Sequence, residues 1–208
     1  MRFPSKLDRV GFVTEGRCAR ANSGSLLEEF LEFSRQSVCR IARISPRTSS
    51  EARENTLSSQ YGLGEFPLHS DFSTDQVPPR YIGLFCPVSR SAATHLFAAE
   101  DVTSSIGTKR DSALFRIATG RRSFSARFRT NGPDGFAYRY NADCMMPVND
   151  DAKEVAQAMK AHFEPTYSID WGVCSMVVFD NWRFFHMRGK SPEDDRGWLW
   201  RIAVWSSK

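Results

Sequence analysis

The sequence lacks a long run of apolar residues, which excludes several classes of protein. No stretch approaches the ~18 consecutive apolar residues that a membrane-spanning helix needs. The first residues, MRFPSKLDRVGFVTEG, carry charges without the apolar stretch of a secretory signal. We therefore expect a soluble, cytoplasmic protein that has no membrane partner.

Cysteine is scarce as well. The five cysteines are odd in number, far apart and without any C-x-x-C pair, which argues against both a disulfide framework and a thiolate zinc site. The net charge is only +4, although five arginines between positions 116 and 129 have no acid among them. Such a run is more often a solvated face than a nucleic-acid groove, so we expect no nucleic-acid partner.

The length of 208 residues, with 41% hydrophobic content, allows one sizeable core and favours a single domain. Residues 24–45 carry apolar side chains at a spacing near 3.6, which predicts one or two amphipathic helices that end before Pro46. We expect residues 1–60 to form a helical or irregular scaffold. The remaining residues, 61–208, are expected to form a core made mainly of strands.

Short apolar runs separated by glycine and proline indicate many strands in that core. The expected strands cover residues 65–72, 81–86, 113–118, 123–129, 136–140, 174–179, 182–187 and 198–205. So many short strands are typical of a sandwich or barrel. One helix interrupts them, because Asn149 or Asp150 can cap a segment in which Val155 and Met159 share a face, ending before Pro165.

Candidate metal ligands occur in two distant places. In the segment FPLHSDFS, read as a strand, His69 and Asp71 are two residues apart and would point to the same face. The pair alone is weak evidence, since surface polarity also explains it. His186 follows the apolar run VVF, which should be a buried strand, so its imidazole needs a partner. Two imidazoles and one carboxylate on one side of a metal suit an iron that binds other ligands opposite.

Arg201 is a further candidate because it lies in WLWRIAVW, a strand with apolar side chains on both faces. A guanidinium in such a place requires an anion, and a bound dicarboxylate could supply one. An internal salt bridge to Asp194 or Asp195 is the alternative.

Three blocks of the sequence resemble the taurine dioxygenase and clavaminate synthase-like family of Fe(II)/2-oxoglutarate oxygenases. They are YGLGEFPLHSDFSTDQVPPRYIGLFC, SAATHLF and DWGVCSMVVFDNWRFFHMRGKSPEDDRGWLWRIAVW. The last arginine of the third block follows its histidine by 15 residues (201 − 186), which is close to the family spacing. The resemblance covers most of the chain from residue 60 onward, with a looser match in the middle.

The resemblance implies a double-stranded β-helix, also called a jelly roll or cupin-like fold, with helices at its flanks. It implies Fe(II) bound by His69, Asp71 and His186, with 2-oxoglutarate and O2 as co-substrates. Arg201 and Thr94 would hold the distal carboxylate of 2-oxoglutarate, with Arg196 as a second, weaker candidate. Asn181 and Arg188 also match the family, and we interpret both as structural.

The implied reaction is the hydroxylation, or another oxidation, of an unactivated C–H bond of a small molecule, with release of succinate and CO2. An amino acid or a natural-product intermediate would fit as substrate. The chain is short for the family, so the N-terminal segment or another subunit, in a homo-oligomer or with a partner protein, would have to enclose the substrate.

Three other hypotheses remain open. The first is a catalytically silent jelly-roll subunit, against which the intact ligands and Arg201 argue. The second is a cupin-like iron enzyme that does not use 2-oxoglutarate. The third is a small basic β-protein that binds nucleic acid, which rests only on the arginine run.

Overall fold

The computed structural model describes residues 3–17, 25–54, 56–119, 122–132, 135–195 and 197–205. Its helices are α1 (Phe3–Val10), α2 (Leu26–Arg35), α3 (Leu57–Tyr61), α4 (Ala99–Val102), α5 (Lys109–Ser112) and α6 (Asp150–Ala158), with the 3-10 helix η1 (Ser104–Ile106). Its strands are β1 (Phe12–Gly16), β2 (Cys39–Ile44), β3 (Tyr81–Phe85), β4 (Thr94–Ala98), β5 (Leu114–Thr119), β6 (Arg122–Arg127), β7 (Arg129–Gly132), β8 (Gly135–Tyr138), β9 (Met145–Pro147), β10 (Tyr167–Ile169), β11 (Cys174–Asp180), β12 (Phe184–Arg188) and β13 (Leu199–Val204). Within these ranges, no helix has the length and apolar character needed to cross a membrane.

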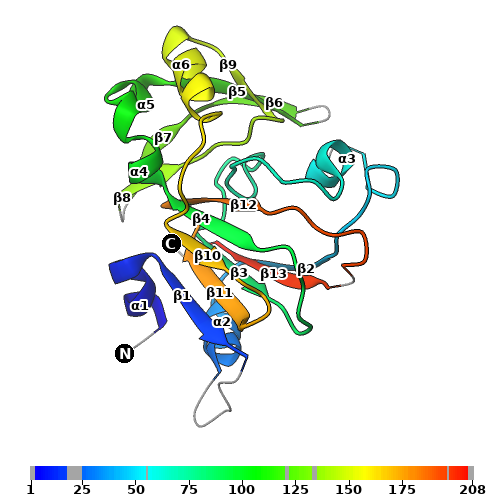
Figure 1. Ribbon diagram of the computed structural model, residues 1–208. Coiled ribbons are helices and arrows are strands. Elements are labelled where there is room, and N and C mark those ends of the chain that lie inside the picture. Colours follow the sequence, from blue (N-terminus) through cyan, green and yellow to red (C-terminus); the bar gives the residue numbers. More distant parts are fainter. Residues whose placement is uncertain are drawn as a thin grey trace.

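A five-stranded antiparallel sheet forms one half of the molecule, with the strand order β1-β11-β3-β13-β2 (Figure 1). Strand β11 contains the apolar run that predicted a buried strand. Its Met176 and Val178 share a core with α1 and α2, whereas Val177 and Phe179 belong to the core on the opposite face of the sheet. Because both faces of β11 are covered, consecutive positions of the strand are apolar.

A three-stranded antiparallel sheet, β10-β4-β12, covers that opposite face. The two sheets share an apolar core, to which the three-stranded sheet contributes Leu96, Ile169 and Phe184. Strand β12 alternates as a strand should, since Phe185 between Phe184 and His186 points away from this core. The residue after Phe185 therefore faces the space between the sheets.

A separate lobe packs on the outer face of the three-stranded sheet. It contains the sheet β6-β5-β9, the hairpin β7-β8 and helices α5 and α6 (Figure 1). Phe115 and Phe128 lie in its core together with Phe185 of β12. The Asn149 side chain accepts a hydrogen bond of 3.0 Å from the Ala152 N–H, so the predicted cap of α6 is confirmed.

The prediction of helices throughout residues 24–45 is wrong in its second half. Helix α2 ends at Arg35, and Cys39–Ile44 forms β2, which pairs with β13 at the edge of the central sheet. Helical spacing in the sequence cannot reveal that distant β13 offers a row of unpaired backbone groups. With β1 also paired in this sheet, the first 60 residues contribute strands to the core and are not only a helical or irregular scaffold.

The predicted strand at residues 65–72 is also wrong. Only His69 forms a ladder pair, an isolated bridge to His186. The next two amides donate elsewhere, Ser70 N–H to the Tyr140 carbonyl and Asp71 N–H to the Asn181 side chain. At the end of the segment Phe72 has a φ of 55°, in the left-handed region, which ends any extended conformation.

The other seven predicted strands correspond to observed ones. Residues 123–129 form two strands because the chain bends at Phe128 between β6 and β7. Strands β1, β2, β4, β9 and β10 were not predicted, and β9 and β10 are only three residues long.

Candidate functional site

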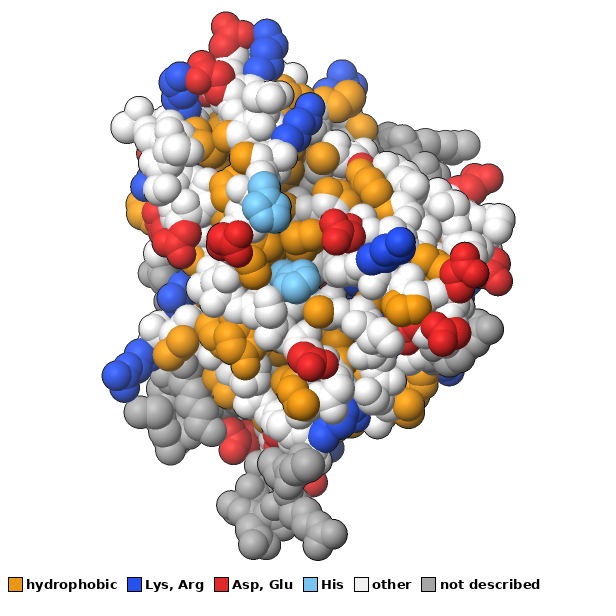
Figure 2. All heavy atoms as spheres, viewed as in Figure 1, with side chains coloured by type: hydrophobic (Ala, Val, Ile, Leu, Met, Phe, Trp, Pro, Cys, Tyr) orange, Lys and Arg blue, Asp and Glu red, His pale blue; other side chains and the backbone are white. Residues whose placement is uncertain are grey.

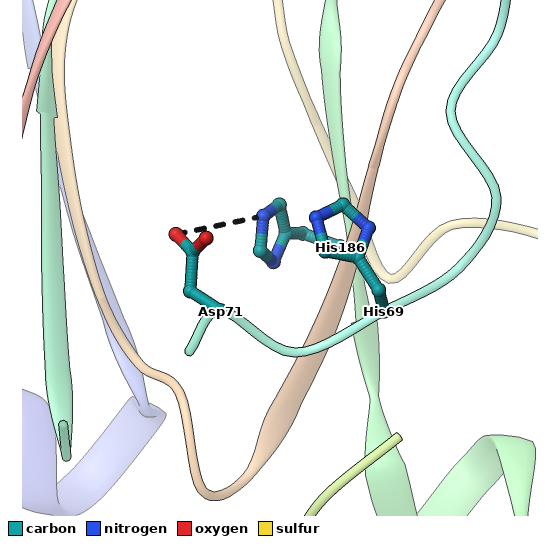
Figure 3. Close-up of side chains that lie close together, drawn as sticks. All are labelled: His69, Asp71 and His186. Atoms are coloured by element: carbon teal, nitrogen blue, oxygen red, sulfur yellow. Dashed lines mark ion pairs between the residues drawn. The ribbon is translucent and has the colours of Figure 1, made fainter. Parts of the chain in front are cut away.

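Three candidate ligands that are far apart in the sequence lie side by side in the fold. The side chains of His69, Asp71 and His186 converge on one point (Figure 3), with one ligand atom of each lying within 4.8 Å of the others. His186 Nε2 lies 3.9 Å from Asp71 Oδ2, and the two imidazole centroids are 4.2 Å apart. All three residues are buried. Among the residues that the structure describes, this is the one such group of metal-ligating side chains.

The backbone joins the two histidines directly. His69 N–H donates to the His186 carbonyl at 3.0 Å, and His186 N–H donates to the His69 carbonyl at 2.9 Å. This reciprocal pair of hydrogen bonds holds the loop that carries His69 and Asp71 against β12, beside His186. The two imidazoles are thereby positioned on neighbouring backbone segments before any ligand binds.

Asn181 fixes the backbone of Asp71. Its Oδ1 accepts from the Asp71 N–H at 2.9 Å, and its Nδ2 donates to the carbonyls of Asp71 at 3.1 Å and Pro79 at 2.9 Å. One side-chain amide therefore replaces the strand partner that this segment lacks. The expectation that Asn181 has a structural role agrees with this geometry.

The ionisation states suit metal binding. Burial lowers the pKa of His69, and burial together with the neighbouring His69 lowers the pKa of His186 to about 3, so both imidazoles are neutral at pH 7. Burial alone would raise the pKa of Asp71, but Arg201 and the two histidines outweigh it and hold this pKa below its usual range. The site therefore presents two neutral nitrogen donors and one carboxylate.

The tautomer of His69 follows from its neighbour. His69 Nδ1 lies 2.8 Å from the Pro67 carbonyl oxygen, which can only accept, so Nδ1 carries the hydrogen and Nε2 keeps its lone pair free. Two donor atoms that each lie about 2.1 Å from one metal ion, at about 90 to 109° from each other, are about 3.0 to 3.4 Å apart. The 3.9 Å between His186 and Asp71 is too long for a hydrogen bond, and the two side chains would need to move only about half an ångström closer to share an ion. The donor set thus fits a divalent transition metal.

Arg201 reaches this site from β13. Its Nη1 donates to Asp71 Oδ1 at 2.6 Å, so its anion is neither Asp194 nor Asp195. The guanidinium lies 4.5 Å from the centroid of the Phe72 ring. The side chain keeps 27% of its exposure, and this arginine is therefore less buried than its apolar neighbours suggest.

A cavity of about 530 Å³ opens over the three ligands, and Thr94 and Arg201 line it with them. Thr94 Oγ1 accepts a hydrogen bond of 3.1 Å from Trp171 Nε1, so the threonine hydroxyl hydrogen stays free to donate into the cavity. Residues 42–47, 52–53 and 56–58 supply one wall. The N-terminal segment therefore does enclose part of the site, as the short length of the chain suggests.

Two further arginines were considered at the sequence level. Arg196 lies outside the described residues. Arg188 donates to the carbonyls of Gly62 and Gly64 at 2.7 and 2.6 Å and stacks over Phe66, which fits a structural role. Sequence reasoning missed Arg90, whose buried side chain lies 3.6 Å from Asp195 and lines the cavity. No local pattern in the sequence marks it.

Several solved structures share this fold, although no protein-family model and no curated protein sequence matches the chain. An asparagine oxygenase, solved with Fe(II), 2S,3S-3-hydroxyasparagine and succinate, is 17% identical over 79% of this chain and 56% of its own, with a TM-score of 0.62. AAD-2, solved with Mn(II) and N-oxalylglycine, is 10% identical over 98% and 86%, with a TM-score of 0.71. PvcB, an Fe, alpha-ketoglutarate dependent oxygenase from an isonitrile synthetic pathway, is 15% identical over 98% and 79%, with a TM-score of 0.64.

The chain therefore has the β-rich fold of iron- and 2-oxoglutarate-dependent oxygenases. Because identities of 10 to 17% are low, the likeness establishes the fold and not the activity. The chain spans just over half the length of the asparagine oxygenase, 56%.

Proposed function

We propose that the protein is a non-haem Fe(II) oxygenase that uses 2-oxoglutarate and O2, with His69, Asp71 and His186 as its iron ligands. The observation that carries the proposal is the buried convergence of two neutral imidazoles and one carboxylate. This donor set leaves open positions on the metal for a co-substrate and O2. When bound, the iron would supply oxidation of an unactivated C–H bond, with 2-oxoglutarate leaving as succinate and CO2.

We propose further that the two facing antiparallel sheets form a double-stranded β-helix, or jelly roll, in a single domain over residues 1–208. The shared core of the two sheets supports this, as does the pairing of β1 and β2 with strands near the end of the chain. The ligands then lie between the sheets of one domain.

Arg201 and Thr94 are the proposed contacts of the distal carboxylate of 2-oxoglutarate. Both line the cavity over the ligands, and both can donate a hydrogen bond to an oxyanion. Arg201 would exchange Asp71 Oδ1 for this carboxylate, which leaves Asp71 to the metal. Arg196 stays a second proposed contact.

The other side chains of the cavity orient the reactants and exclude water. Leu84 and Leu199 give it apolar walls, and Pro67 and Asn181 hold the ligand-bearing loop in place. We propose a small-molecule substrate, such as an amino acid or a natural-product intermediate. A homo-oligomer or a partner subunit that completes the enclosure remains part of the proposal.

The direct test is anaerobic titration of the protein with Fe(II) and 2-oxoglutarate, followed by visible absorption. We expect the weak band of the iron-bound 2-oxo acid in the wild-type protein and its loss in His69→Ala. A wild-type protein that binds Fe(II) but gives no band would favour a silent subunit or an iron enzyme without 2-oxoglutarate.

The arginine run offers little support for the nucleic-acid hypothesis. Arg129 is buried and paired with Asp111, and Arg127 donates to the Asp111 carbonyl. Figure 2 shows acidic and basic side chains interspersed on the visible face, without a continuous basic surface there.

A further inference from the structure

The cavity over the proposed iron site has an unusual charge balance. Six arginines line it, and Asp71 is the one carboxylate among the described lining residues. The arginines are Arg43, Arg47, Arg53, Arg90, Arg188 and Arg201. Such an excess of one sign raises the local concentration of ligands of the opposite charge.

Among the described residues, two of these arginines have an acidic partner. Arg201 pairs with Asp71 and Arg90 with Asp195, whereas no ion pair between described residues involves the other four. Fe(II) and 2-oxoglutarate carry equal and opposite charges, so binding both would leave the excess of positive charge unchanged. This excess of positive charge remains available to attract a further anion.

Three of the unpaired arginines form what we call the arginine rim, namely Arg43, Arg47 and Arg53, all of them exposed to solvent. Arg43 is held 4.5 Å from the centroid of the Trp198 ring, and Arg47 Nη1 donates to the Glu51 carbonyl at 3.3 Å. The Arg53 side chain has no hydrogen-bond or ion-pair partner among the described residues. Arg43 and Arg47 are thus held by neighbouring groups, and none of the three rim arginines pairs with an acidic side chain among the described residues.

Two carboxylates lie close to the rim in sequence, Glu51 and Glu54, and among the described residues neither forms an ion pair with a rim arginine. Glu51 accepts from the Thr48 N–H at 3.2 Å and from the Thr48 hydroxyl at 2.9 Å. A little further along, Thr56 caps helix α3 through a reciprocal pair of hydrogen bonds with Ser59. These local contacts give the wall that carries Arg47 and Arg53 a defined shape.

We infer that the substrate carries an oxyanion, a carboxylate or a phosphate, which the arginine rim binds while the carbon to be oxidised lies at His69, Asp71 and His186. This inference rests on the proposed function and adds the chemical class of its substrate. A guanidinium offers paired donors that match both oxyanions, and the rim is distinct from Arg201, the proposed 2-oxoglutarate contact.

The test compares matched probes on the full chain loaded with Fe(II) and saturating 2-oxoglutarate, without O2 and at low ionic strength. Hexanoate, hexyl phosphate and hexanamide are titrated calorimetrically into the wild type, an Arg47→Gln/Arg53→Gln variant and an Arg116→Gln/Arg127→Gln control. The control removes two exposed arginines of β5 and β6 that do not line the cavity. Charge-assisted hydrogen bonds predict that at least one anionic probe binds the wild type about tenfold more tightly than hexanamide.

The rim variant should lose this preference, and the control should keep it. A preference for hexyl phosphate over hexanoate, or the reverse, would identify the oxyanion. Equal affinity for charged and neutral probes in the wild type, no binding of either anion, or an unchanged preference in the rim variant would overturn the inference.

A separate readout distinguishes the two proposals. If the absorption band of the iron-bound 2-oxo acid is present but the anion preference is absent, the oxygenase proposal stands and the substrate class fails. If the band is absent while the rim-dependent preference is present, the anion site stands and the oxygenase proposal fails.

Discussion

The space between the two sheets and the lobe beside it differ in the kind of side chain that they bury. Between the sheets, buried positions are occupied by polar groups such as His69, Asp71, Thr94 and His186. In the lobe, the core of β5, α6 and their neighbours is almost entirely apolar and aromatic. Burying polar groups reduces stability unless they are paired, whereas apolar burial increases it. The lobe therefore contributes stability, whereas the space between the sheets combines an apolar core with the polar groups of the proposed site.

The two regions meet at β12, which serves both. Phe185 points into the lobe core and His186, the next residue, into the site. Substitutions on the two sides of this strand should therefore separate loss of function from loss of stability.

The largest effect is expected for His186→Ala, which removes one metal ligand. Iron binding and turnover should fall by about a thousandfold or more, because the remaining two ligands hold the ion poorly. The metal-free protein should stay folded, since the imidazole is costly to bury. Iron content and turnover are measured beside His95→Ala, a histidine on β4 that bonds Ser168 and lies outside the site. Equal losses in both variants would contradict the assignment.

Phe115→Ala, in the lobe, should instead reduce stability and leave iron binding unchanged. Phe115 is fully buried and contacts the rings of Phe128 and Tyr140, so its truncation should cost about 3 to 5 kcal/mol of unfolding free energy. Iron affinity of the folded fraction should not change. Urea denaturation measures the loss, with the half-exposed Met146→Ala on neighbouring β9 as control. A fall in iron affinity without loss of stability would refute the division between the two regions.

Arg201→Gln should leave iron binding intact and raise the apparent KM for 2-oxoglutarate by about 10- to 100-fold, the effect of one lost charge-assisted contact. Steady-state turnover against 2-oxoglutarate concentration measures it. Arg40→Gln is the matched control, since Arg40 lies in adjacent β2 and pairs with Asp75 at the surface. An unchanged KM in Arg201→Gln would remove this residue from the co-substrate site.

The smallest effect is expected for Asn181→Ala, which leaves all ligands in place but releases the Asp71 backbone. Loss of such a supporting contact should weaken iron binding about 10-fold. Equilibrium dialysis with Fe(II) measures the change, and Asn141→Ala, which removes an exposed side-chain contact to the Asp143 backbone, serves as control. Iron affinity equal to that of the wild type would show that Asn181 does not position Asp71.

The sequence was informative where a strand is buried on both faces, or where a charged or polar side chain in an apolar strand needs a partner. The apolar run before His186 and the guanidinium of Arg201 in an apolar strand both indicated positions that the structure brings into one site. The reasoning for His69 and Asp71 reached the right residues through a strand that does not exist. Their convergence depends on Asn181, which lies 110 residues from Asp71 in the sequence, and no local spacing predicts its contact with the Asp71 backbone.

The edge strand β2 and the arginine rim are features that the sequence did not predict. Residues 39–44 become a strand because β13 lies beside them, and Arg47 and Arg53 reach the cavity because the chain that follows turns over it. Both outcomes depend on long-range packing and not on local spacing.

The reciprocal hydrogen bonds between the backbones of His69 and His186 also make the site observable without any ligand. Each of the two amides is protected by the other residue's carbonyl, so neither can exchange with deuterium from solvent unless the loop separates from β12. The two amides should therefore show the same free energy of opening in the metal-free protein, and Fe(II) should raise it for both. Different opening free energies, measured by NMR or mass spectrometry, would mean that the loop and strand open separately.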